Sequence, residues 1–136
     1  MSGKLVQLYQ KMADLTAPEC AGVGKGSCRC PHSCCDEMAC IITKEFALTQ
    51  GVVLQEYPPN HKGAFYLGEN GCTVAPHLRP ICTVHTCQIG SLGFKPGDPN
   101  WTKKYFKLRD TIDALESKEN DGRRMHTPMP PRILLL

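Results

Sequence analysis

The first segment of the chain has the hydrophobic pattern of an amphipathic helix. Its apolar residues recur every three or four positions, with charged and amide side chains between them. These apolar residues are Leu5, Leu8, Tyr9, Met12 and Leu15. The pattern predicts a helix over residues 1–16, which must end before Pro18 because a proline inside a helix removes a hydrogen bond.

The most regular pattern lies near the C-terminus, where apolar residues follow one another at spacings of four, three, four and three. They are Trp101, Tyr105, Leu108, Ile112 and Leu115. Asp98 can cap this helix, Pro99 suits its first turn, and Gly122 is a suitable stop. We expect a helix over residues 98–121 that packs on the core of the chain. A coiled coil with a partner helix is the alternative.

The middle of the chain has weaker patterns. Residues 17–31 are rich in glycine, proline and cysteine, which is typical of a loop. Thr43, followed by Lys44 and Glu45, predicts a helix start with Thr43 as the N-cap, and this helix should run to about Leu54. Over residues 65–87, short apolar pieces alternate with glycine and proline, which predicts a short hairpin or turn and one helical turn.

These patterns indicate a mainly α-helical fold with irregular cysteine-rich loops and at most one short hairpin. A chain of 136 residues usually forms one domain with one modest core. Because it also has eleven prolines, twelve glycines and nine cysteines, we expect a small domain stapled by metal. The expected parts are a helix at 1–16, a cysteine-cluster core at 17–97, a helix at 98–121 and a proline-rich tail at 122–136.

The cysteines can form disulfides, bind a metal or fill the core, and the compartment decides between the first two. Lys4, Lys11 and Asp14 interrupt the apolar residues at the N-terminus, so the continuous run of a signal peptide is missing. No stretch approaches the roughly 20 apolar residues that span a membrane. An odd number of cysteines would also leave one thiol unpaired in a disulfide framework. We therefore expect a cytoplasmic protein with reduced thiols and no membrane segment.

The charge pattern does not identify a partner. The formal net charge is +3, but a tetrathiolate site with one divalent ion would add about −2. The basic residues of the last predicted helix share it with Asp110, Asp113 and Glu116, so a solvated mixed face explains them better than a nucleic-acid surface. The tail at 122–136 is either a disordered end or a short peptide that docks on a protein partner through its terminal aliphatic residues.

The cysteines fall into two groups that we expect to bind metal together. Thiolates bind soft and borderline metals, and loops that bring sulfurs together from two segments would close the chain around the ion. The expected ligands are Cys28, Cys30, Cys34, Cys35, Cys72, Cys82 and Cys87. Cys20, Cys40 and His85 are optional ligands, because a buried cysteine also serves as a small apolar residue and a lone histidine is more often a surface residue.

The metal stays open between zinc and an iron-sulfur cluster. Structural zinc sites favour two residues between cysteines, whereas the first group has gaps of one and zero residues. The adjacent Cys34 and Cys35 point apart in an extended backbone, so they could span a polynuclear cluster or serve two ions. Copper ranks third.

At these residues the chain resembles the YkgJ-like cysteine-cluster family, which is marked by a CxxCxxCC motif and described as zinc- or iron-chelating. Cys28, Cys34 and Cys35 match the first, third and fourth cysteines, whereas Pro31 stands at the second and Cys30 lies one residue earlier. The later family motifs, a Gly-Cys pair, an Arg-Pro pair before a cysteine and a final cysteine, have counterparts at Cys72, Cys82 and Cys87. The resemblance covers residues 28–87 and implies metal chelation, with no reaction to carry over.

Two functions follow from this chemistry. The first is a metal-stapled module that binds a protein partner, and the alternative is an iron-sulfur redox or sensor protein in which Arg29 and Arg79 tune the thiolates. A hydrolytic site would need a carboxylate base such as Asp36, Glu37 or Glu69, and all-sulfur coordination argues against it. We therefore expect no catalytic residues, and an enzyme is the less favoured interpretation.

Overall fold

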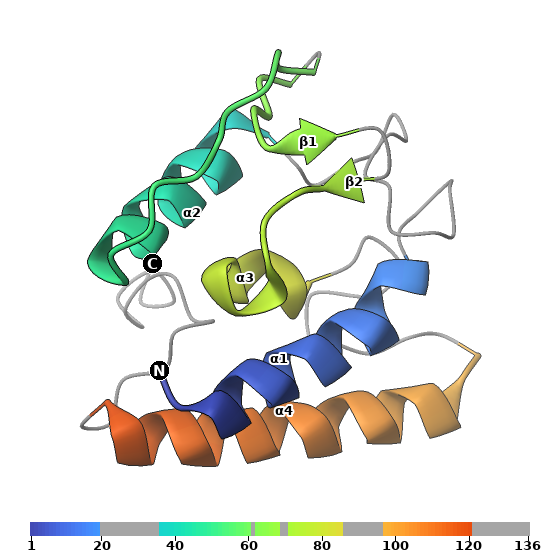
Figure 1. The fold of residues 1–136 in the computed structure, drawn as a ribbon. Coiled ribbons are helices and arrows are strands. Elements are labelled where there is room, and N and C mark those ends of the chain that lie inside the picture. Colours follow the sequence, from blue (N-terminus) through green and yellow to red (C-terminus); the bar gives the residue numbers. More distant parts are fainter. Residues whose placement is uncertain (20–35, 61, 69–70, 86–96, 121–136) are drawn as a thin grey trace, which may run out of the picture.

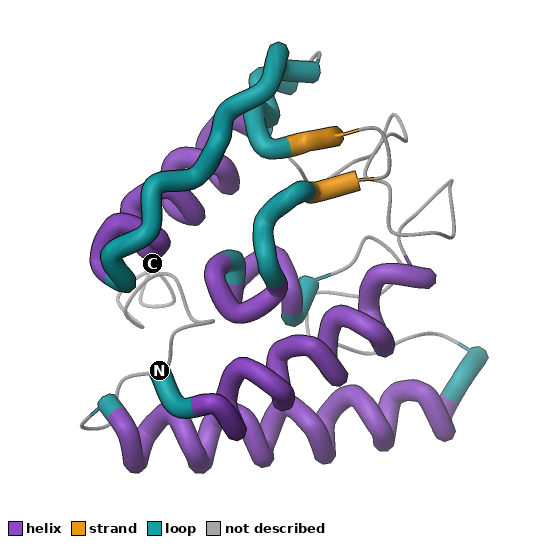
Figure 2. Tube along the Cα trace, in the orientation of Figure 1, coloured by secondary structure: helices purple, strands orange, loops and turns teal. Residues whose placement is uncertain are grey.

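The computed structural model describes residues 1–19, 36–60, 62–68, 71–85 and 97–120. Within these ranges the chain is mainly helical (Figure 2). In chain order the helical elements are α1 (Gly3–Thr16), η1 (Ala17–Glu19), α2 (Glu37–Thr49), η2 (Pro76–Leu78), α3 (Pro80–Thr83) and α4 (Pro99–Glu119). Strands β1 (Leu67–Gly68) and β2 (Gly71–Cys72) form one short antiparallel hairpin. The predicted fold class, mainly helical with one hairpin in a small domain, is confirmed.

Helices α1 and α4 lie side by side and run antiparallel, and together they form the lower layer of the molecule in Figure 1. The backbone N–H of Ser2, at the start of α1, donates to the Glu119 carboxylate at the end of α4 (3.1 Å). At the opposite ends, the Trp101 indole N–H donates to the carbonyl of Leu15 (3.3 Å). Both predicted helices are therefore confirmed, and α4 uses its apolar stripe within the chain.

The apolar faces of α1 and α4 form the larger hydrophobic cluster. Its buried residues are Leu5, Leu8, Tyr9, Met12, Val84, Trp101, Tyr105 and Ile112. Leu15, Leu108 and Leu115 pack against this cluster and keep some exposure. The side chain of Asp98 accepts a hydrogen bond from the Trp101 backbone N–H (3.0 Å), which confirms the predicted cap. Gly122, the predicted stop, lies outside the described residues.

Helix α2 begins and ends earlier than its sequence predicted. Asp36, not Thr43, is the N-cap, because its carboxylate accepts from the backbone N–H of Ala39 (2.8 Å). Thr43 is a buried residue in the middle of the helix. The helix ends at Thr49 rather than near Leu54, since Gly51 takes a left-handed conformation (φ 76°). Such a glycine after the C-cap allows the following N–H groups to bond back to the last carbonyls, as Val52 does with Ala47 (2.9 Å).

The upper layer, which we define as residues 36–60, 62–68 and 71–74, contains α2 and the hairpin (Figure 1). Leu67 pairs with Cys72 in the hairpin. The segment after α2 returns along it and bonds to the residues before β1, with the Tyr57 N–H donating to the Phe65 carbonyl (2.8 Å). A second, smaller hydrophobic cluster forms here from Cys40, Ala64, Tyr66, Val74 and Leu78.

Short helix α3 connects the two layers. The Thr16 hydroxyl of α1 donates to the Thr83 carbonyl (2.7 Å), and the Tyr105 hydroxyl of α4 donates to the Val84 carbonyl (2.7 Å). The Thr83 hydroxyl in turn donates to the carbonyl of Pro76 (2.7 Å). These bonds hold the end of α3 against the lower layer. None of the helices in the described ranges is both long and apolar enough for a bilayer crossing.

Candidate metal centre

Three of the candidate cysteines lie in the described part of the chain, each on a different element. Cys40 is in the first turns of α2, Cys72 ends β2, and Cys82 is in α3. Cys40 is buried, and Cys72 and Cys82 are partly buried. The remaining candidate cysteines, which lie outside the described residues, are Cys20, Cys28, Cys30, Cys34, Cys35 and Cys87.

Cys40 and Cys72 belong to the same environment. Cys40 is only 7% exposed and forms part of the second cluster, while Cys72 is half-buried and packs against that cluster. Tyr66 is the largest side chain in this cluster. The hairpin register brings Cys72 to the cluster, because Leu67, next to Tyr66 in the chain, pairs with Cys72. Two candidate ligands that are distant in sequence therefore contact one hydrophobic cluster.

Cys82 approaches the same helix one turn further along. Its Sγ lies 3.9 Å from the hydroxyl oxygen of Thr43. Residues three apart share a helix face, so Thr43 and Cys40 lie on the inner side of α2 together. Cys40 and Cys82 are therefore both associated with the inner side of α2.

The described residues do not by themselves form a complete ligand set. Among them, no three histidine, cysteine or acidic side chains are close enough to hold one metal ion. The segment with the densest cysteines joins directly to Asp36, the cap of α2, and Cys87 follows two residues after His85. The soft sulfur donors fit zinc or iron better than magnesium or calcium, which prefer oxygen.

Tyr66 is a buried polar residue that the sequence analysis did not single out. Its ring is 1% exposed, and its hydroxyl is buried with no hydrogen-bond partner among the described residues. Burial raises the pKa of the phenol above its ordinary value, and the negative charge of Glu56 acts in the same direction. The only signal in the sequence was its position just before the hairpin that carries Cys72.

His85 lies in the turn after α3, where its backbone N–H donates to the carbonyl of Cys82 (3.3 Å). Partial removal of the ring from water lowers its pKa below the ordinary value, although the residue as a whole is exposed. A lowered pKa favours the neutral imidazole, which is the form that binds metal. His85 therefore stays an optional ligand, adjacent to Cys82 in the fold.

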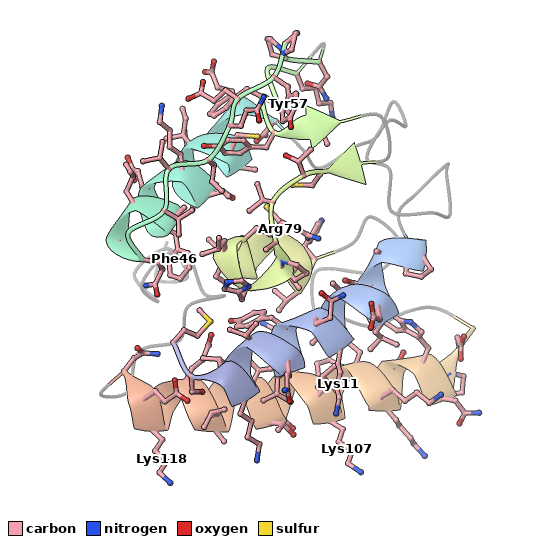
Figure 3. The ribbon with its side chains drawn as sticks, in the orientation of Figure 1. Lys11, Phe46, Tyr57, Arg79, Lys107 and Lys118 are labelled. Carbon is pink, nitrogen blue, oxygen red and sulfur yellow. The ribbon has the colours of Figure 1, made fainter. Side chains whose placement is uncertain are left out.

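Two of the residues named for other chemistry, Asp36 and Arg79, have structural tasks. Asp36 caps α2, Glu37 is an exposed residue in its first turn, and Glu69 lies outside the described residues. The Arg79 Nε donates to the Val74 carbonyl (2.9 Å), beside the segment that joins β2 to α3 (Figure 3). Arg29 lies outside the described residues.

The basic residues of α4 that carry labels in Figure 3, Lys107 and Lys118, point away from α1. Both are exposed. They fit the solvated mixed face expected from the sequence.

Comparison with known proteins finds no family model, no curated protein and no solved structure that matches this chain.

Proposed function

We propose that this chain is a metal-binding cysteine-cluster protein that holds an iron-sulfur centre or zinc and acts as a metal-stapled protein-interaction module in the cytoplasm. The observation that supports it best is that three cysteines from separate elements lie around α2. Cys40 is in α2, Cys72 packs against the cluster that contains Cys40, and the Cys82 Sγ lies 3.9 Å from the hydroxyl oxygen of Thr43 in α2. The resemblance to the YkgJ-like family stays a prediction.

The weakness of the upper layer supports a stapling role. Its strands have two residues each, and a two-stranded hairpin is marginally stable without further support. Its hydrophobic cluster has one large side chain, Tyr66, whereas the cluster between α1 and α4 contains two tyrosines and a tryptophan. A metal bound by thiolates from several segments would supply folding free energy where the apolar core is small.

The outer surface of the same layer supports a protein partner. Met38 and Leu48 of α2 are 62% and 51% exposed, and Val53 in the segment that follows is 85% exposed. Exposed apolar side chains mark interaction surfaces where they form a contiguous patch, so these three residues are the ones to test for contact with a partner. A bound metal would hold α2 and this segment in place for recognition.

Cys40, Cys72 and Cys82 would supply thiolates to the centre, together with the cysteines of residues 28–35 and Cys87. When bound, the metal supplies cross-links between segments, and an iron-sulfur cluster would also supply electron transfer. The side-chain contact that the structure gives Arg79 is with a backbone carbonyl, which makes it an anchor for the loop after β2. That role favours a stapled module over a tuned redox centre.

The test is elemental analysis and a visible spectrum of protein purified without oxygen, followed by chelation. We expect zinc or iron bound per chain, and chelation should unfold the protein and abolish most of its circular dichroism. A brown preparation that bleaches on reduction identifies the iron-sulfur alternative. A metal-free preparation with undiminished circular dichroism contradicts the proposed function.

A further inference from the structure

We propose that the outer face of α2 is a docking site for the chain's own tail, residues 121–136, which binds there through the aliphatic run at residues 133–136. The tail lies outside the described residues. The inference goes beyond the proposed function and does not depend on bound metal. A protein partner that uses the same face would have to displace the tail.

The docking face is the side of α2 that points away from the core. Cys40, Thr43 and Ala47 are buried and mark the inner side of the helix. The residues of the opposite side are mostly apolar and recur at spacings of three and four. These residues, which we call the outer face, are Met38, Ile41, Ile42, Glu45 and Leu48. Met38 and Leu48 are 62% and 51% exposed, and the two isoleucines are partly exposed.

An apolar outer face is unusual for a helix at the surface of a domain. Such a helix usually has charged and polar residues on the side that faces solvent. Neither hydrophobic cluster of the described residues includes the four apolar residues of the outer face. A further apolar segment that covers them would explain why they are not polar.

The position of the end of α4 makes the tail a local candidate for this segment. The Ser2 hydroxyl and backbone N–H both donate to the Glu119 carboxylate, so α4 ends at the start of α1. Helix α1 contacts η2 and α3, and both of these contact α2. The ends of α2 and α4 also lie on the same side of the molecule, at the left of Figure 1. The tail therefore starts on the side of the molecule where α2 ends.

The tail is also long enough to follow α2. Three prolines, at positions 128, 130 and 131, favour an extended chain, which spans up to about 37 Å over residues 121–132. The 13 residues of α2 rise only about 20 Å. Tethering through a short linker gives an effective concentration on the order of millimolar, so even a weak contact by a few aliphatic side chains is mostly formed.

The charges of the two segments are complementary. Arg132 directly precedes the aliphatic run, and Arg123 and Arg124 lie near the start of the tail. Glu45 lies within the outer face and is exposed, and Glu37 is exposed in the first turn of the same helix. A basic and aliphatic peptide can therefore cover the apolar residues while its guanidinium groups stay near carboxylates.

The test uses the full-length chain with Leu135→p-benzoylphenylalanine, a photoreactive side chain that crosslinks to neighbouring C–H bonds. Nitrogen-15-labelled and unlabelled chains are mixed at micromolar concentration and irradiated. Mass spectrometry then locates each crosslink and shows whether it joins one chain or two. Met38→Gln/Leu48→Gln removes exposed apolar groups from the outer face, and Phe106→Gln, at a 36% exposed residue of α4, is the matched control.

We expect crosslinks from position 135 to α2 within one chain. Their yield should fall at least about fivefold in Met38→Gln/Leu48→Gln, because two apolar contacts are lost, and circular dichroism should not change. Phe106→Gln should crosslink as the parent chain does. If the double variant does not fold, the crosslink map of the parent chain decides the matter.

Crosslinks mainly to other elements, or only between two chains, overturn the inference, and the second result would assign the outer face to another copy. Elemental analysis of the same samples is a separate readout. Metal-free protein with the crosslink intact contradicts the proposed metal centre alone, and bound metal without the crosslink contradicts the docking site alone.

Discussion

The hydroxyl of Tyr9 donates a hydrogen bond to the carboxylate of Glu116, and both side chains are completely buried between α1 and α4. The two residues are 107 positions apart, so this bond joins two helices that are distant in the sequence. Together with the bond from Ser2 to Glu119 near the surface, it sets the register of the helix pair. A polar bond at the centre of an apolar interface favours one alignment of the helices over a slipped one.

We predict that Tyr9→Phe lowers the free energy of unfolding by about 1.5–3 kcal/mol, because a bond to a charged group is lost in a buried place. Glu116→Gln should cost less, since its amide oxygen still accepts. Urea unfolding followed by circular dichroism measures both, and the double variant gives their coupling energy. Glu119→Gln, at the exposed bond, is the control and should leave the free energy of unfolding nearly unchanged. Equal losses for Tyr9→Phe and Glu119→Gln would contradict the buried bond's importance.

Stability should fall at alkaline pH because of the buried tyrosines. Burial is the main cause that raises the pKa of Tyr9, Tyr66 and Tyr105, whereas an unfolded tyrosine titrates near about 10. Below that pH both states are protonated and stability is unaffected. Above it the unfolded chain loses protons first, so the free energy of unfolding falls by about 1.4 kcal/mol per pH unit for each tyrosine.

Urea titrations at pH 9, 10 and 11 under reducing conditions measure this slope. For Tyr105→Phe, the fall in the free energy of unfolding with pH should be smaller than for wild type by the contribution of one tyrosine, about 1.4 kcal/mol per pH unit. Ultraviolet absorbance that reveals phenolates in the folded protein near pH 10 would show that these rings are not protected.

Two glycines with the same backbone conformation should respond differently to alanine. Gly51 and Gly63 have φ angles of 76° and 82°, so alanine at either costs about 1–2 kcal/mol for the left-handed conformation. A Cβ on Gly63 would also lie 3.0 Å from the Cβ of Glu37, whereas nothing lies within 4 Å at Gly51. We expect Gly63→Ala to lower the free energy of unfolding by about 1 kcal/mol more than Gly51→Ala. Equal midpoints in urea would mean that α2 moves to accommodate the methyl group.

Cys40, an optional ligand by sequence, should prove to be part of the centre. We predict that Cys40→Ser lowers the bound metal or speeds its loss to a chelator at least about tenfold, because Cys40 shares the environment of Cys72 and Tyr66. Ala47→Ser is the control, since Ala47 is completely buried on the same helix but has no thiol. Elemental analysis after gel filtration measures the metal. Full metal retention in Cys40→Ser would show that Cys40 is a buried core residue and not a metal ligand.

The N-cap of α2 can be tested by experiment, because the sequence pattern predicted Thr43 and the structure has Asp36 at this position. Asp36→Ala should cost about 0.5–2 kcal/mol because the Ala39 N–H loses its acceptor. Thr43→Ser keeps a hydroxyl but removes a buried methyl group, and should cost about 1 kcal/mol through packing. In thermal unfolding followed by circular dichroism, Asp36→Ala should show a loss of helix at the onset of melting, and Thr43→Ser should not. An unaffected Asp36→Ala would contradict its role as the cap.

Local patterns predicted α1 and α4 well because the helical period depends on residues that are near one another in the sequence, such as Tyr105 and Ile112. It does not depend on the rest of the chain. The start of α2 was wrong because Thr43 followed by acidic and basic residues also occurs inside a helix. Asp36 was considered as a catalytic base, not as a cap, because it follows the dense cysteines.

The sequence by itself determined the two amphipathic helices, a short hairpin or turn between residues 65 and 87, and the presence of cysteines in two groups, since these depend on residue types and short spacings. Only the tertiary structure decided that the two helices pack on each other, that Cys40 and Cys72 contact the cluster of Tyr66, and that the Cys82 sulfur lies near the Thr43 hydroxyl. The physical reason is that burial and hydrogen-bond satisfaction depend on which elements pack together. The unpaired hydroxyl of Tyr66 arises from contacts among α2, the hairpin and the segment between them, which no local pattern records.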